Sequence, residues 1–182
     1  MALAVGFDLG DTLIRYRDVP LNWRELYPPA LSAVAAACGL NVGESGRAAA
    51  EAILLRYNTR VNPRVEEVTA DRVFGEILTA WGESTHRAPV AAEAFFAFFR
   101  RESELCPDVL PLLQQLRARK VPVGILTDVA YGMPREIVER DLAPFQQYVE
   151  VLITSVEVGC RKPDPRGYVA LAGHLGVAPA GV

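Results

Sequence analysis

The sequence contains few cysteines, and those it has are badly placed for cross-linking. Cys38, Cys106 and Cys160 are odd in number and far apart along the chain. Such spacing excludes a disulfide framework and does not match a cysteine-based metal site. We therefore expect a protein of a reducing compartment, the cytoplasm.

The chain also lacks a basic excess and a long hydrophobic run. Its 182 residues carry a formal net charge of -3, whereas nucleic-acid binders usually carry a basic excess. No apolar run approaches the roughly 20 residues that span a bilayer, and an acid at position 8 argues against a signal peptide. We expect a globular protein with no nucleic-acid partner and no membrane partner.

Short apolar runs alternate with helical patterns in the C-terminal half. Three runs have the length and composition of strands buried on both faces of a sheet: residues 2–9, 121–127 and 148–154. Helical patterns begin near Pro107, Met133 and Asp164. Because parallel strands are joined by right-handed crossovers, helices should cover both faces. The prediction is an α/β fold with a Rossmann-like, three-layer parallel sheet.

A long stretch between the first two predicted strands has helical periodicity throughout. Apolar residues recur over 73–81 with Thr69 as a plausible N-cap, and further helices are expected after Trp23, over 48–57 and after Pro89. Turn chemistry is expected at Ser45–Gly46. We predict an α-helical insertion over residues 16–104, with residues 1–15 and 105–182 forming the α/β core. Its aromatic residues (Trp23, Trp81 and Phe95 to Phe99) are expected in the core of the protein.

Polar side chains follow each of the three predicted strands. Asp8 ends the first, Thr127 and Asp128 end the second, and Lys162 lies in the loop after the third. Ligands of open α/β sheets bind beyond the carboxyl ends of the strands. A carboxylate, a hydroxyl and an ammonium at one edge suit nucleophilic attack on a phosphoryl group and formation of an aspartyl-phosphate.

The segments FDLGDTL, ILTD and GCRKPDP, in this order and spacing, resemble the motifs of the haloacid dehalogenase superfamily. The helical insertion resembles that family's cap. The resemblance implies a small phosphorylated substrate, Asp8 as the nucleophile, and Lys162 as the residue orienting it. Thr127 would bind the phosphoryl group, with Asp128 beside it in substrate binding or as a turn residue. It also implies Mg²⁺ held by Asp8 and the backbone carbonyl of Gly10.

One departure from the family pattern concerns the residues after Asp8. The family's phosphatases carry a second Asp two residues after the nucleophile, as general acid and base. Here that position is Gly10, and Asp11 stands where those enzymes usually have glycine. General acid–base help is typically worth about 10²–10⁴-fold. Asp11 is therefore either a surrogate catalytic acid or a turn residue bonded to backbone amides, and we expect slow phosphatase activity.

A second departure lies at the end of the chain. The family continues into another strand, beside the first, whose acids complete the magnesium site. This sequence ends at Val182, where that strand should start. We expect an incomplete metal site and a first strand at the sheet edge. A truncated form, an interrupted reading frame and a chain completed by a partner are the open explanations, and a homodimer also stays open.

Two other functions stay open beside the phosphatase. The family's 2-haloacid dehalogenases use the same Asp to displace halide from carbon, need no magnesium and lack the second Asp. The KPDPRGY segment also resembles their loop. The other alternative is a pseudo-enzyme or interaction module that has kept the fold.

Overall fold

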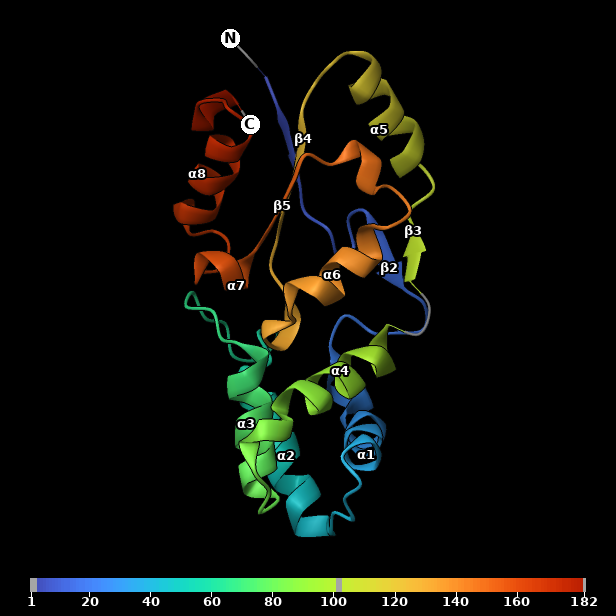
Figure 1. The fold of residues 1–182 in the computed structure, drawn as a ribbon, viewed down its shortest axis with the longest axis vertical. Coiled ribbons are helices and arrows are strands. Elements are labelled where there is room, and N and C mark those ends of the chain that lie inside the picture. Colours follow the sequence, from blue (N-terminus) through green and yellow to red (C-terminus); the bar gives the residue numbers. More distant parts are fainter. Residues whose placement is uncertain (1–2, 101–102, 182) are drawn as a thin grey trace.

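A three-stranded parallel sheet lies in the upper half of the computed structural model (Figure 1), which describes residues 3–100 and 103–181. The strands, in the order β1-β4-β5, are Val5–Phe7 (β1), Val123–Thr127 (β4) and Val151–Thr154 (β5). Phe7 pairs with Ile125, and Thr127 pairs with Thr154. This parallel register brings the carboxyl ends of the three strands to one edge of the sheet.

Helices cover both faces of this sheet, as predicted (Figure 1). They are α5 (Val109–Ala118), α6 (Arg135–Leu142), α7 (Ser155–Val158) and α8 (Pro165–His174). On one face, Leu126 and Ile153 of the strands pack against Leu171 of α8. On the other face, Ile125 and Leu113 join a larger apolar cluster. The three-layer α/β architecture is confirmed.

Four further helices gather at the carboxyl edge of the sheet, in the lower half of Figure 1. They are α1 (Tyr27–Ala37), α2 (Glu44–Tyr57), α3 (Ala70–Ala80) and α4 (Ala88–Phe99), with 3-10 turns η1 (Trp23–Leu26) and η2 (Thr85–Arg87). Thr69 caps α3 by accepting a hydrogen bond from the Arg72 amide, as expected. Phe95, Phe96 and Phe99 are fully buried. We call these helices the cap.

The insertion is not wholly helical, and this corrects the sequence-based prediction. β2 (Ile14–Tyr16) pairs antiparallel with β3 (Ser103–Leu105), Ile14 lying opposite Leu105. These strands are the two connections between the sheet and the cap. Each has three residues, too few for an alternating pattern to stand out.

Several element boundaries also differ from the predictions. Ser45 and Gly46 lie inside α2, which begins at Glu44, so the turn expected there is wrong. The three sheet strands are shorter than their apolar runs. Residues 146–148 form a 3-10 turn, η4 (Gln146–Tyr148), before β5. An apolar run marks burial, whereas a strand extends only where a neighbour supplies hydrogen bonds.

The strand β1 is an edge strand among the described residues, because it pairs with β4 alone. Just before β1, the Ala4 amide donates a hydrogen bond to the Gly181 carbonyl over 2.9 Å. Gly181 ends the last 3-10 turn, η5 (Pro179–Gly181). The two described ends of the chain therefore lie side by side at this edge.

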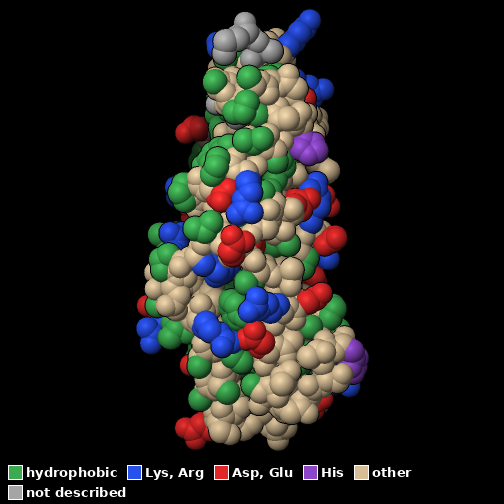
Figure 2. All heavy atoms as spheres, turned by 90° about the vertical axis from the view of Figure 1, so that its left-hand side faces the viewer, with side chains coloured by type: hydrophobic (Ala, Val, Ile, Leu, Met, Phe, Trp, Pro, Cys, Tyr) green, Lys and Arg blue, Asp and Glu red, His purple; other side chains and the backbone are tan. Residues whose placement is uncertain are grey.

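The surface mixes charges of both signs. Figure 2 shows acidic and basic side chains interspersed across the middle of the face that it presents, without a large area of one sign. On α8, Tyr168 and Val169 are exposed apolar side chains. Within residues 3–100 and 103–181, no helix has the length and apolar character needed to cross a bilayer.

Candidate active site

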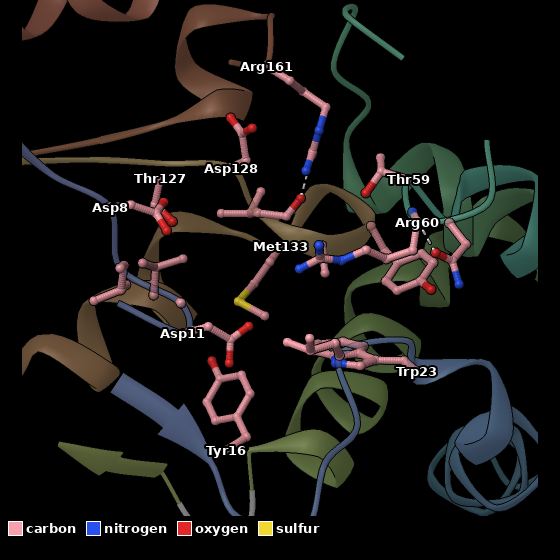
Figure 3. Close-up of a pocket in the computed structure, with 18 of the residues that line it drawn as sticks. Asp8, Asp11, Tyr16, Trp23, Thr59, Arg60, Thr127, Asp128, Met133 and Arg161 are labelled. Carbon is pink, nitrogen blue, oxygen red and sulfur yellow. Dashed lines mark hydrogen bonds between the residues drawn. The ribbon is translucent and has the colours of Figure 1, made fainter. Parts of the chain in front are cut away.

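A cavity of about 470 Å³ lies at the carboxyl edge of the sheet, between the strands and the cap (Figure 3). All the residues that the sequence singled out for the site line it: Asp8, Gly10, Asp11, Thr127, Asp128 and Lys162. They come from three separate segments at the carboxyl ends of the strands, which the parallel register brings together. The structure thus unites the predicted set in one place, and the roles of its members stay predictions.

Asp8 and Lys162 form the closest charged contact in the cavity. The Lys162 Nζ donates hydrogen bonds to Asp8 Oδ1 over 2.5 Å and to the Leu126 carbonyl over 3.0 Å. The other carboxylate oxygen, Oδ2, accepts from the Thr12 hydroxyl over 3.1 Å. The Asp8 side chain keeps 37% of its surface exposed. A carboxylate that accepts a hydrogen bond from an ammonium group and remains accessible from the cavity can act as a nucleophile.

Thr127 is the last residue of β4 and is 4% exposed. Its side chain makes no hydrogen bond to the part of the chain that the structure describes, so its hydroxyl is available to a ligand in the cavity. Val129, and not Thr127, occupies the N-cap position of the following 3-10 turn, η3 (Ala130–Gly132).

Asp128 holds the loop that carries Lys162. Its Oδ1 accepts a hydrogen bond from the Lys162 backbone amide over 3.1 Å. This contact suits the turn-residue alternative, in which Asp128 shapes the site. Asp128 also lines the cavity.

Gly10 and Asp11 form the tight turn after Asp8. Asp11 has a φ of 59°, in the left-handed region, and its amide donates to the Ile14 carbonyl over 2.8 Å. Its side chain is exposed and makes no hydrogen bond to the described residues. The turn-residue alternative, in which this carboxylate bonds backbone amides, is therefore not what the structure contains.

The donors for a divalent cation are few. Within the described residues, no three His, Cys, Asp or Glu side chains gather closely enough to hold a metal ion. Asp8 and the Gly10 carbonyl are hard oxygen donors on one turn. They fit Mg²⁺ chemically, because this ion usually keeps several waters and takes one or two carboxylates together with substrate phosphate.

The cap side of the cavity contains residues that the sequence analysis missed. Thr59 and Arg60, from the loop after α2, lie across the cavity from Asp8, and Trp23 lies below them (Figure 3). The Arg60 guanidinium has no partner in the described part of the chain. Trp23 packs against the core as expected, with its ring centroid 4.0 Å from that of Phe99, and it also lines the cavity.

Neither Arg60 nor Trp23 stood out in the sequence as a residue of the site. Arginine is the usual cation of this chain, so Arg60 resembles many surface arginines. An aromatic residue at the start of a helical pattern is more often a core residue. Only the packing of the cap on the sheet shows which of these side chains face the cavity.

A buried polar cluster supports the floor of the cavity. The Asp141 carboxylate, from α6, accepts hydrogen bonds from the Tyr16 hydroxyl and from Arg100, each over 2.6 Å. The Asp141 side chain is 2% exposed and that of Arg100 is 13% exposed. Burial, with the Asp141 carboxylate alongside, raises the pKa of Tyr16 far above its ordinary value. Tyr16 is therefore a neutral hydrogen-bond donor at any physiological pH.

Comparisons with known proteins agree with this geometry. Residues 3–182 match the family described as haloacid dehalogenase-like hydrolase. A phosphoserine phosphatase of Thermus thermophilus is 36% identical over 141 residues, which make up 74% of this chain and 54% of that protein. The chain thus spans about half the length of this curated relative.

Two solved structures share the fold at low sequence identity. A 2-haloacid dehalogenase from Pseudomonas syringae aligns with a TM-score of 0.60 and 22% identity, over 97% of this chain and 74% of that one. A HAD phosphatase from Thermococcus onnurineus aligns with a TM-score of 0.60 and 19% identity, over 99% of this chain and 74% of that one. Together with the family match, the parallel sheet and the helical cap, these findings show that the chain belongs to the haloacid dehalogenase-like hydrolases.

Proposed function

We propose that this hydrolase is a phosphatase of small phosphate monoesters, with Asp8 as its nucleophile. The observation that carries the proposal is the Asp8 carboxylate itself. It is bound to the Lys162 ammonium over 2.5 Å and open to a cavity that the Thr127 hydroxyl also lines. The named activity of the 36% identical relative supports the same reaction class.

The reaction follows from these groups. An Asp8 oxygen attacks phosphorus, the bond from phosphorus to the alcohol oxygen breaks, and an aspartyl-phosphate forms. Water then attacks phosphorus, which releases inorganic phosphate and regenerates the Asp8 carboxylate. The Lys162 ammonium offsets the repulsion between the two anions that must meet, and the Thr127 hydroxyl donates to a phosphoryl oxygen.

Two parts of the reaction depend on the turn after Asp8. The departing alcohol oxygen needs a proton, and Asp11 is the acid of this turn, although its position differs from the family's. Asp8 and the Gly10 carbonyl would hold Mg²⁺, which would neutralise phosphate charge when bound. Because the proton donor is displaced, we expect slow turnover of alkyl phosphates.

The substrate we propose is a small phosphorylated molecule with anionic character. Arg60 lies across the cavity from Asp8 (Figure 3), and its guanidinium has no partner among the described residues. The relative's name makes phosphoserine the first compound to test. The carboxylate of phosphoserine gives the Arg60 guanidinium a partner, in addition to the contacts of the phosphate.

The test is release of inorganic phosphate from phosphoserine and from p-nitrophenyl phosphate, with and without Mg²⁺. Asp8→Asn should abolish turnover, because an amide oxygen is a poor nucleophile. Asp108→Asn is the matched control, since Asp108 is an exposed acid outside the cavity. Turnover that survives in Asp8→Asn would refute Asp8 as the nucleophile.

Gly10 favours a second candidate, the 2-haloacid dehalogenase reaction. That chemistry uses no acid at this position, because the leaving halide needs no proton. Asp8 would displace chloride from carbon, and water would hydrolyse the resulting ester. Chloride release from 2-chloropropionate without Mg²⁺ would support this candidate. Absence of turnover in both assays would favour the pseudo-enzyme.

A further inference from the structure

A second attachment joins the cap to the core, away from the two connecting strands. The cap segment 65–67, between α2 and α3, lies antiparallel to the core loop 159–161. The Arg161 amide donates to the Val65 carbonyl over 2.8 Å, and the Glu67 amide donates to the Gly159 carbonyl over 3.0 Å. In Figure 1 this green loop rises from the cap to α7. The core loop in question leads directly into Lys162.

The Glu67 side chain occupies the centre of this attachment. It is 1% exposed, although it comes from the cap. Its Oε1 accepts from Arg64 Nη2 over 2.8 Å, and its Oε2 accepts from the Ser155 hydroxyl over 2.6 Å and from Arg161 Nη1. A buried carboxylate needs such partners, because an unpaired buried charge is costly.

Two partners of Glu67, Ser155 and Arg161, also contact Val129 in the loop after β4. The Ser155 hydroxyl accepts from the Val129 amide over 3.0 Å, and Arg161 Nη1 donates to the Val129 carbonyl over 2.7 Å. Val129 follows Asp128, whose carboxylate binds the Lys162 amide. One carboxylate of the cap therefore ties together the loop after β4, the start of α7 and the loop before Lys162.

We propose that Glu67 is a positioning residue for Lys162. It touches neither Lys162 nor the substrate side of Asp8, and it acts through Arg161, Ser155 and Val129. Lys162 holds Asp8 correctly only while the cap segment 65–67 is seated on the core loop. The cap thereby completes the catalytic geometry as well as closing the cavity. For its kinetic part, this proposal rests on the proposed phosphatase function.

Glu67→Gln tests the proposal with little change of shape. In the variant, the new side-chain NH₂ group is a donor and cannot accept hydrogen bonds from the Arg64 and Arg161 guanidinium groups. The core loop 159–161 should therefore be held less firmly against the cap segment 65–67. Partners that orient catalytic groups typically contribute about 10–100-fold to activity. We expect kcat to fall by about that factor while KM changes less, because Lys162 acts mainly on the transition state.

A chemical readout does not depend on turnover. The sequence contains two lysines, Lys120 and Lys162, and Lys120 is exposed. Brief acetylation followed by mass spectrometry gives the acetylation rate of Lys162. The acetylation rate of Lys120 serves as the internal reference. The engaged Lys162 should react slowly in the wild-type protein and faster in Glu67→Gln. If the wild-type protein shows no phosphatase activity, this measurement still decides the proposal.

Glu93→Gln is the matched control. Glu93 of α4 pairs with Arg140 of α6 over 2.5 Å, so it also joins cap to core, but both side chains are about half exposed. In this variant, the acetylation rate of Lys162 relative to Lys120 should equal that in the wild-type protein. If Glu67→Gln does not fold, Ser155→Ala removes one contact of Glu67 and should also raise the Lys162 rate. Unchanged relative labelling of Lys162 in the folded variant would overturn the proposal.

Discussion

The backbone at Asp11 lies in the left-handed region, with φ at 59°. Glycine adopts this region without cost, whereas Asp and Asn are among the few other residues that visit it routinely. Gly10, by contrast, has an ordinary φ, and a Cβ added to it would meet no heavy atom within 4 Å. The turn therefore has room for an acid at position 10 and a backbone suited to glycine at position 11.

The double substitution Gly10→Asp with Asp11→Gly should create a faster phosphatase. It places an acid two residues after Asp8, and general acid–base help is worth about 10²–10⁴-fold. The gain in kcat should be larger for phosphoserine than for p-nitrophenyl phosphate, since nitrophenolate departs without a proton. Asp11→Gly alone is the control and should bring no gain. Equal rates for the folded double variant and the wild-type protein would contradict this account.

Asp164 gives a pH-dependent prediction at the same scale. It caps α8, and hydrogen bonds from the Arg166 side chain and amide lower the pKa of Asp164 to about 2. Because the pKa falls on folding, the stabilisation is present above the unfolded value of about 3.9 and is lost as pH falls toward 2.

Asp164→Asn keeps a side chain that can act as the N-cap of α8 but removes the titrating carboxyl group. The variant therefore isolates the contribution of Asp164 ionisation to stability. The wild-type protein should be more stable than the variant at pH 6, and this advantage should shrink as pH falls below about 4. Urea midpoints between pH 6 and pH 3 measure it. A difference that stays constant over this range would argue against the assignment.

Among the elements, the turn η3 packs closely against the chain of the cap at Gly132. A Cβ built on Gly132 would overlap the Val68 carbonyl oxygen, just before α3. The preceding Tyr131 also has a positive φ, of 50°, and its hydroxyl meets that of Tyr27 of α1 over 2.5 Å. Such backbone strain persists only where the surroundings enforce it, and here the cap does so.

Gly132→Ala should therefore destabilise the protein more than Gly176→Ala does. Both glycines have a φ of +68°, so both variants carry the left-handed cost of roughly 1–2 kcal/mol. At Gly176 nothing lies within 4 Å of the added Cβ, whereas at Gly132 the methyl group overlaps backbone. Overpacking should add about 1–3 kcal/mol to the loss at Gly132. Urea unfolding compares the two, and equal losses would show that the contact is easily relieved.

Across the whole molecule, the cap and the core share one apolar cluster. Phe95 of the cap, Tyr131 of η3 and Ile125 of β4 all belong to it. The Asp141 cluster reinforces this union, because Tyr16 and Arg100 lie on the two chain segments that join the cap to the core. The orientation of the cap over the cavity is thus held by packing and by a buried ion pair.

Arg100→Ala should destabilise the protein by about 3 kcal/mol, because it leaves the buried Asp141 carboxylate without its cation. The loss should appear in the midpoint of urea unfolding. Arg140→Ala removes an exposed pair with Glu93 and should cost about 0–1 kcal/mol. Similar losses for the two variants would mean that water reaches Asp141 in the folded protein.

The sequence was most informative where a local rule leaves a clear pattern. Pro165 after Asp164 marked the start of α8, and the period of apolar residues from Val73 marked α3. Three-residue strands left no such pattern, so β2 and β3 were missed. Polar residues at strand ends could be assigned to one edge because parallel strands point the same way.

By itself the sequence determined the α/β class, the helical insertion and the polar residues at the carboxyl edge. These follow from periodicity, capping and strand direction, which act over a few residues. Only the tertiary structure decided which cap residues face the cavity and that Glu67 is buried among core loops. Those outcomes depend on contacts between segments about 90 residues apart, as Glu67 and Arg161 are. No local pattern records such contacts, because their energy arises only when packing excludes water from both partners.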